Sequence, residues 1–81
     1  MKLIPLGSNK TVISFLNGLE IFFSYQTPVA ANLPDRGYVR TSTSWSQTTS
    51  RHINQWLEGV TAEKVSQTFL DSLVELKPVQ V

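Results

Sequence analysis

The chain has 81 residues, no cysteine and a formal net charge of +1 at pH 7. This length favours one domain, 1–81, and the lack of cysteine excludes a disulfide framework and thiolate-held metal centres. The small net charge excludes a strongly basic nucleic-acid binder, although basic residues outnumber acidic ones in 1–56 and the reverse holds in 57–81. Apolar runs are short, so we expect neither a signal peptide nor a membrane partner.

The clearest local signal is a hairpin over residues 10–25. Residues 11–16 and 19–25 are rich in β-branched and aromatic side chains, and they flank Asn17 and Gly18. Asn-Gly suits a two-residue type I′ turn, which would place Val12 opposite Phe23. Both faces of this hairpin are apolar near its middle. We therefore expect cover on both sides, by a curled barrel on one and by a helix or another subunit on the other.

Three shorter segments complete the predicted strands. Pro5 interrupts residues 2–6, which indicates an edge strand or a lead-in, and Pro28 suits the first position of another edge strand over 27–32. Residues 33–37 read as a turn and 38–42 as a strand. Five strands with tight turns predict a mainly β (α+β) fold. We expect a small, five-stranded, antiparallel and strongly bent Sm-like or SH3-like barrel over residues 2–43.

Two helices are predicted over residues 48–76. A hydroxyl residue within 48–50 can cap the first helix, which runs to Glu58, with Gly59 as its left-handed C-cap. Thr61 can cap the second helix, and Pro78 closes it. Helical spacing gives the first helix a buried stripe of Ile53, Trp56 and Leu57. The second helix shares a face among Ala62, Val65, Phe69, Leu73 and Leu76.

A set of short motifs lies between about residues 10 and 74. The motifs are Asn17-Gly18, Phe23-Ser24-Tyr25, residues 27–31, Gly37-Tyr38-Val39-Arg40-Thr41, Trp45-Ser46, Thr48-Thr49-Ser50, His52-Ile53-Asn54 and Trp56-Leu57. With these motifs the chain resembles a family of small proteins from marine cyanophages and ocean metagenomic sequence. The resemblance implies an Sm-like barrel in a homo-oligomeric ring, roughly five to seven subunits around. It also implies binding of single-stranded RNA or DNA, and a location in the cytoplasm of the infected bacterial host or in the virion.

Arg36-Gly37 lies in the turn where Sm proteins carry an Arg-Gly or Lys-Gly pair. Arginines hold phosphates and aromatic faces stack on unpaired bases. The predicted nucleic-acid-binding residues are Lys10, Tyr25, Arg36, Gly37, Tyr38 and Arg40. The alternative is that both tyrosines are core or interface residues and the arginines are solvated.

The residues favour a protein that is not an enzyme. One histidine and no cysteine leave no Cys-His pair, and no nucleophile elbow presents a serine. Without a phosphate loop or metal-ligand spacing, we expect no cofactor and no metal. We expect His52 to be a helix-start residue packed near Trp56, and Trp45 to be buried in the fold or at a subunit contact.

Two functions follow from these features. The first is a ring-forming protein of phage origin that binds single-stranded nucleic acid in RNA or DNA processing. The second is a non-catalytic structural or assembly protein whose homo-oligomeric ring is itself the function. Salt dependence separates them, because phosphate binding weakens steeply as salt rises.

Overall fold

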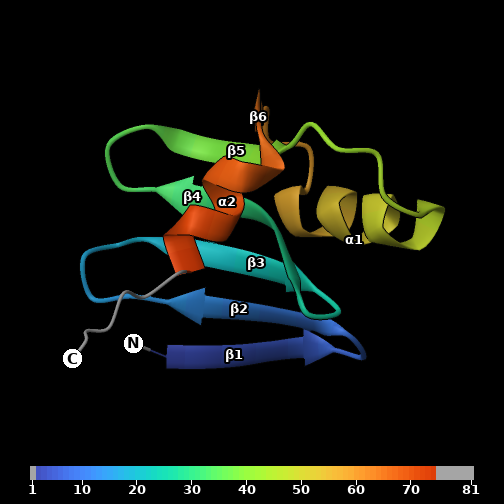
Figure 1. Ribbon diagram of the computed structural model, residues 1–81. Helices are drawn as coiled ribbons and strands as arrows, with labels where there is room; N and C mark the ends of the chain where they lie inside the picture. The colour runs from blue at the N-terminus through green and yellow to red at the C-terminus, as the bar shows by residue number, and fades with distance from the viewer. Residues whose placement is uncertain (1, 75–81) are drawn as a thin grey trace.

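The computed structural model describes residues 2–74 and contains one six-stranded sheet whose strands lie in chain order (Figure 1). The strands are β1 (Lys2–Gly7), β2 (Lys10–Ser14), β3 (Glu20–Ser24), β4 (Thr27–Leu33), β5 (Gly37–Thr41) and β6 (Glu63–Val65). Neighbours are antiparallel from β1 to β5, and β6 is parallel to β5. Parallel pairing needs a crossover, and helix α1 (Gln47–Leu57) lies in it.

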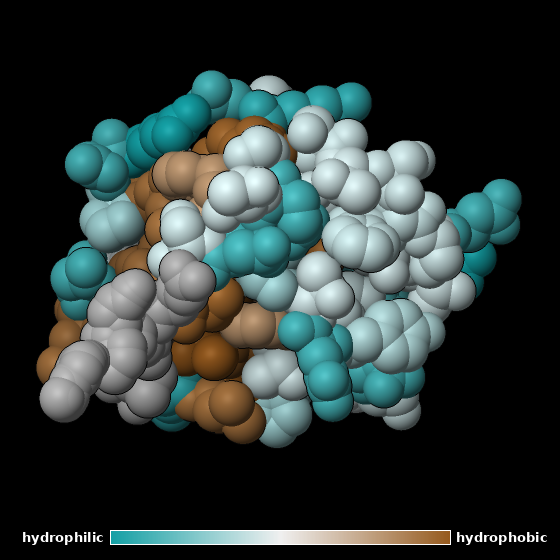
Figure 2. Space-filling model, viewed as in Figure 1, coloured by the Kyte–Doolittle hydropathy of each residue, from teal (hydrophilic) through white to brown (hydrophobic). Residues whose placement is uncertain are grey.

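The two helices cover opposite faces of the sheet. Successive side chains of a strand point to opposite faces. In β4, Ala30 belongs to the apolar cluster that includes Ile53 of α1, whereas Ala31 belongs to the cluster that includes Leu70 of α2 (Gln67–Val74). In the view of Figure 1, α2 lies in front of the sheet. Figure 2 shows apolar surface beside α2, over the part of the sheet that contains β1 to β3.

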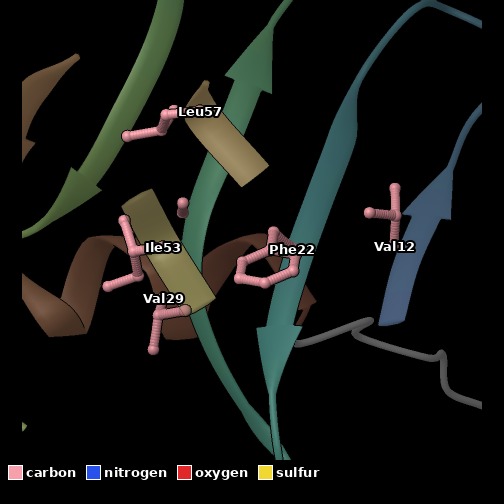
Figure 3. Close-up of a cluster of buried hydrophobic side chains, with 6 residues drawn as sticks. Val12, Phe22, Val29, Ile53 and Leu57 are labelled. Atoms are coloured by element: carbon pink, nitrogen blue, oxygen red, sulfur yellow. The ribbon is translucent and has the colours of Figure 1, made fainter. Parts of the chain in front are cut away.

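The α1 face carries the core that positions the candidate site. Its buried members are Val12, Phe22, Val29, Ala30, Ile53 and Leu57 (Figure 3). Phe22 is fully buried between β2 and β4. Phe22 belongs to the same cluster as Ile53 and Leu57 of α1. Burying a phenylalanine side chain contributes about 1.5–3 kcal/mol, so the packing of Phe22 helps to hold α1 on the sheet.

Helix α1 begins and ends slightly earlier than its sequence predicts. Ser46 is the N-cap, because its Oγ accepts a hydrogen bond from Thr49 N at 3.2 Å. Glu58 is the left-handed C-cap with φ 49°, so the position expected for Gly59 is occupied by a residue with a Cβ. Trp56 is half-buried, and Thr49 joins Ile53 and Leu57 in the buried stripe.

The fold class is α+β as predicted, but the strand number and the closed barrel are corrected. The sheet has six strands and is open, with β1 and β6 at its two edges. Residues expected at the start of the second helix instead form β6, where Lys64 lies opposite Arg40 of β5. The second helix begins only at Gln67. Its predicted end, with Leu76 and Pro78, lies outside the described residues.

The hairpin register also differs from the predicted one. Val12 lies opposite Phe22, not Phe23, because the loop has three residues rather than two. Phe15 O accepts a hydrogen bond from Gly18 N at 3.1 Å, and Gly18 adopts φ 95°. This is a turn followed by a left-handed glycine, the usual three-residue loop. Helix α1 covers one face of the hairpin, where Val12 and Phe22 pack against it, and the open sheet of residues 2–74 does not curl over the other face as a barrel would.

Strand β4 is central, which corrects its predicted place at an edge. It lies between β3 and β5. The register shifts between Phe22 and Phe23, next to the position where Pro28 lies opposite Phe23. An irregularity of this kind accommodates a proline that cannot donate to the ladder. Strand β1, in contrast, is an edge strand as its proline predicted.

Candidate functional site

The six residues predicted to bind nucleic acid do not form one surface. Lys10 and Tyr25 lie at the end of the sheet where β1 joins β2 and β3 joins β4. Arg36 and Gly37 lie at the β4–β5 turn, at the opposite end of the sheet (Figure 1). Tyr38 and Arg40 lie on β5, on the α1 face, where they contact Trp56 and Asn54 of the helix.

Tyr25 has an unusual backbone conformation. Its φ is 60°, in the left-handed region, where a bulky side chain is an outlier and glycine is the usual choice. Tyr25 N donates to Asn9 O at 2.8 Å, which fixes the turn against the β1–β2 connection. The side chain is 50% exposed, and its ring lies 5.9 Å from that of His52. The turn therefore presents an aromatic ring at the surface beside a histidine.

His52 lies in the middle of α1, which corrects its expected place at the helix start. Its Nδ1 lies 2.8 Å from Ser24 Oγ, and Ser24 Oγ lies 3.2 Å from Thr49 Oγ1. Burial lowers the pKa of His52, and the positive charges of Lys10 and Arg51 lower it further. No local sequence pattern predicts this contact, because Ser24 and His52 are 28 residues apart in the chain.

Two cations flank α1. On the β2 side, Lys10 Nζ donates to Gln55 Oε1 at 3.2 Å, and on the β5 side an Arg40 guanidinium N–H donates to Asn54 Oδ1 at 3.2 Å. Arg51 is exposed on the helix itself. Arg40 Nε is buried without a hydrogen-bond partner, so its side chain is only partly satisfied. The α1 side of the molecule thus gathers three positive charges from three elements.

A cleft of about 410 Å³ lies along α1 on the β1–β2 side. Trp56 and Leu6 supply its apolar wall, and the fully buried Phe22 lies next to it. The Phe22 and Trp56 rings are stacked, with centroids 5.1 Å apart and an interplanar angle of 6°. Polar groups line the rest of the cleft: Lys10, His52, Gln55 and Glu58. A second hollow is lined by Asn9, Tyr25, Gln26 and Thr27.

Arg36 is engaged within the protein. Its Nε and one terminal nitrogen donate to the two carboxylate oxygens of Glu63 at 3.1 and 3.0 Å. Its guanidinium carbon also lies 5.4 Å from the centre of the Phe69 ring. The Arg36 hydrogen bond and charge lower the pKa of Glu63. This pair fastens the β4–β5 turn to β6, so Arg36 presents a largely neutralised charge.

Gln67 organises a second polar network that the sequence did not reveal. Its Oε1 accepts hydrogen bonds from Thr41 Oγ1 at 2.8 Å and Trp45 Nε1 at 3.1 Å. Its Nε2 donates to Pro28 O at 2.7 Å. Trp45, expected to be buried in the fold or at a subunit contact, is 44% exposed within the single chain and held through its indole N–H, so it is not buried in the fold. Only the crossover brings these residues together.

The Ser24–His52 pair has the geometry of a nucleophile and base but not the access. Ser24 is 1% exposed, so a substrate does not reach its hydroxyl.

Within residues 2–74 no group of three or more His, Asp or Glu side chains is arranged to hold a metal ion. No helix in that part of the chain is long and apolar enough to cross a membrane. The arrangement offers a surface with an aromatic ring, cations and a cleft, which are features of a binding site.

Comparison with models of protein families matches residues 1–72, a span that takes in the whole sheet and α1. No curated protein and no solved structure matches the chain. The match confirms an uncharacterised family over this span, and the marine phage and Sm-like interpretations stay proposals. The chain belongs to the family of unknown function DUF8033.

Proposed function

We propose that this domain binds single-stranded nucleic acid through the end of the α1 side where Tyr25, Lys10 and Arg51 lie. The observation that carries the proposal is the conformation of Tyr25, a half-exposed aromatic residue at φ 60°. Such strain costs about 1–3 kcal/mol and is retained where surroundings or function require it. A glycine would fit this turn at lower cost, so the aromatic ring itself has a role at the surface.

The chemistry around Tyr25 supports a polyanion with unpaired bases. Stacking of a base on an aromatic side chain contributes about 1–3 kcal/mol and tolerates any base. Lys10 and Arg51 add positive charge close enough to His52 to lower its pKa. Cations on two different elements suit a phosphate backbone that passes over the helix. Each contact between a cation and a phosphate releases condensed counterions, which makes binding favourable at low salt.

The binding surface differs from the one that the sequence predicts. Lys10 and Tyr25 remain in it, and Arg40 extends it on the far side of α1. Arg36 and Gly37 are left out, because Glu63 occupies the Arg36 guanidinium and both residues lie at the other end of the sheet. Tyr38 packs edge-on against Trp56 with ring centroids 5.6 Å apart, so it supports the helix.

Fluorescence anisotropy with labelled oligo-U, oligo-A and oligo-dT at two salt concentrations tests the proposal. We expect Tyr25→Gly to weaken binding about fivefold or more without lowering the melting temperature, because the substitution removes a stacking ring and relieves φ strain. Lys10→Gln should lower the salt slope by about 0.7, the value for one phosphate contact of a single strand.

Two matched controls make the test specific. Lys2→Gln removes the same charge at the start of β1, at the end of the sheet opposite Tyr25, and Arg36→Ala removes an arginine already paired with Glu63. Both should bind like the unaltered protein. Absence of binding at low salt, or equal losses in Lys10→Gln and Lys2→Gln, would reject this surface.

Assembly is the second candidate function, and the open sheet favours it. A head-to-tail ring requires two different surfaces that pair, and the sheet has two different edges, β1 and β6. Residues of β1 are mostly exposed, with Leu3 65% exposed. Pairing of β1 with β6 of the next copy would cover both edges. The resemblance to marine phage proteins would place such a ring in the infected host or the virion.

A further inference from the structure

The cleft beside α1 combines a flat apolar wall with hydrogen-bonding groups on its rim. Trp56 is half-buried and lines the cleft, and the fully buried Phe22 stacks on the Trp56 ring and holds it in place. The volume of about 410 Å³ lies within the range of roughly 300–1,000 Å³ found for small-molecule pockets. A flat ring is the shape that matches an aromatic wall, since stacked rings keep the largest contact area.

A chain of hydroxyl groups holds the His52 ring through its Nδ1. Ser46 Oγ lies 3.4 Å from Thr49 Oγ1, which lies 3.2 Å from Ser24 Oγ. Ser24 Oγ lies 2.8 Å from His52 Nδ1, and the donor of this hydrogen bond depends on the His52 tautomer. In the tautomer with the proton on Nε2, Ser24 donates to Nδ1 and the Nε2–H group is free to donate. Since His52 also lines the cleft, this tautomer offers a donor to a ligand oxygen or ring nitrogen.

The other rim groups define the rest of the ligand. Lys10 uses one N–H toward Gln55, and an ammonium group has two more donors for an anion. Glu58 provides a carboxylate that accepts from an amino or ring N–H group. A donor, an acceptor and a cation around a flat apolar wall match a heterocyclic base that carries a phosphate.

We propose that this cleft is a pocket for a single nucleotide, with its base against Trp56, its edge hydrogen-bonded to His52 and its phosphate on Lys10. The inference takes its ligand class from the proposed function but does not need a polymer. In a bound strand, this pocket would hold one base turned out of the stack while Tyr25 supports a neighbouring base. The unit that the surface recognises is therefore a single nucleotide.

Tryptophan emission reports directly on the pocket. The variant Trp45→Phe leaves Trp56 as the one tryptophan of the chain. Titration of this variant with AMP, CMP, GMP and UMP should quench its emission in a saturable way, whereas ribose 5-phosphate and inorganic phosphate should leave it unchanged. In the unaltered protein, the same titration should shift the Trp56 indole N–H signal in NMR, which keeps the test independent of the variant's folding.

Substitutions separate the pocket from a general anion site. In the Trp45→Phe background, Lys10→Gln should weaken the nucleotide affinity about tenfold, and Lys64→Gln should not change it. Equal responses to ribose 5-phosphate and to nucleotides would overturn the base pocket. If oligonucleotides bind but no monophosphate changes the Trp56 signals, the pocket is rejected and the proposed function stands. If monophosphates bind and oligonucleotides do not, the pocket stands and the proposed function fails.

Discussion

The Ser24 hydroxyl lies 2.8 Å from His52 Nδ1 and joins the end of β3 to the middle of α1. Thr49 also approaches Ser24, so one buried serine connects two helix residues one turn apart. The contact positions His52 between Tyr25 and the cleft. It therefore couples the packing of the sheet to the geometry of the proposed site.

Replacement of Ser24 tests this coupling. Ser24→Ala leaves His52 Nδ1 and the Thr49 hydroxyl without their shared partner, and an unsatisfied buried polar group costs about 1–3 kcal/mol. We expect the free energy of unfolding to fall by that amount in urea denaturation. Ser44→Ala, at an exposed loop position, should change it by less than about 0.5 kcal/mol. Equal effects of the two substitutions would show that the hydroxyl chain does not form.

The stability of the domain should fall in mild acid because of His52. Burial and two neighbouring cations lower its folded-state pKa, whereas the unfolded chain keeps the ordinary value of about 6.5. The unfolded state then binds the proton more tightly, so stability is greatest above about pH 6.5 and decreases as the pH falls toward the folded-state pKa. Urea denaturation at pH 8, 7, 6 and 5 measures this slope. His52→Gln should be flatter between pH 7 and 6, and parallel curves would contradict the assignment.

The three-residue loop between β2 and β3 should depend on Gly18. Its φ of 95° is strained for any other residue, although a Cβ there would meet Pro34 Cβ at an ordinary distance of 3.9 Å. Gly18→Val should therefore destabilise the domain by about 1–3 kcal/mol through the backbone alone. Leu16→Val, in the same loop at a 98% exposed position, is the control and should be nearly neutral. Thermal unfolding of both variants decides the matter.

Assembly through the sheet edge should depend on Leu3. We expect light scattering at micromolar concentration to give a mass above that of the monomer, because two open strand edges favour pairing between copies. Leu3→Lys should lower that mass by placing a charge on β1, while Leu16→Lys makes the same change away from the edge and should not. A monomeric mass for the unaltered protein would end the assembly proposal.

Sequence by itself determined the elements whose signals are local. The turn at Asn17 and Gly18, the β-branched and aromatic strands around it, and α1 all form where the pattern predicts them, within one or two residues. Turn chemistry and hydrophobic periodicity act over a few residues, so they are legible in the chain. The loop length was not, because Asn-Gly serves both two-residue and three-residue turns, and that one residue moved Phe22 opposite Val12.

Tertiary structure decided everything that depends on distant partners. Residues 63–65 belong to a segment whose apolar residues follow helical spacing. They nevertheless form β6, because the edge of β5 is unpaired where the crossover returns to the sheet. Arg36 meets Glu63 across 27 residues, and Ser24 meets His52 across 28. The contact with Glu63 pairs the charge of Arg36, which the sequence predicted to bind nucleic acid. The contact with Ser24 places His52, which the sequence did not predict to bind, in the candidate site. These contacts stabilise the protein only once it has folded. The energy of a charge pair or a buried hydrogen bond depends on the distance between the groups in space, and not on their separation in the sequence.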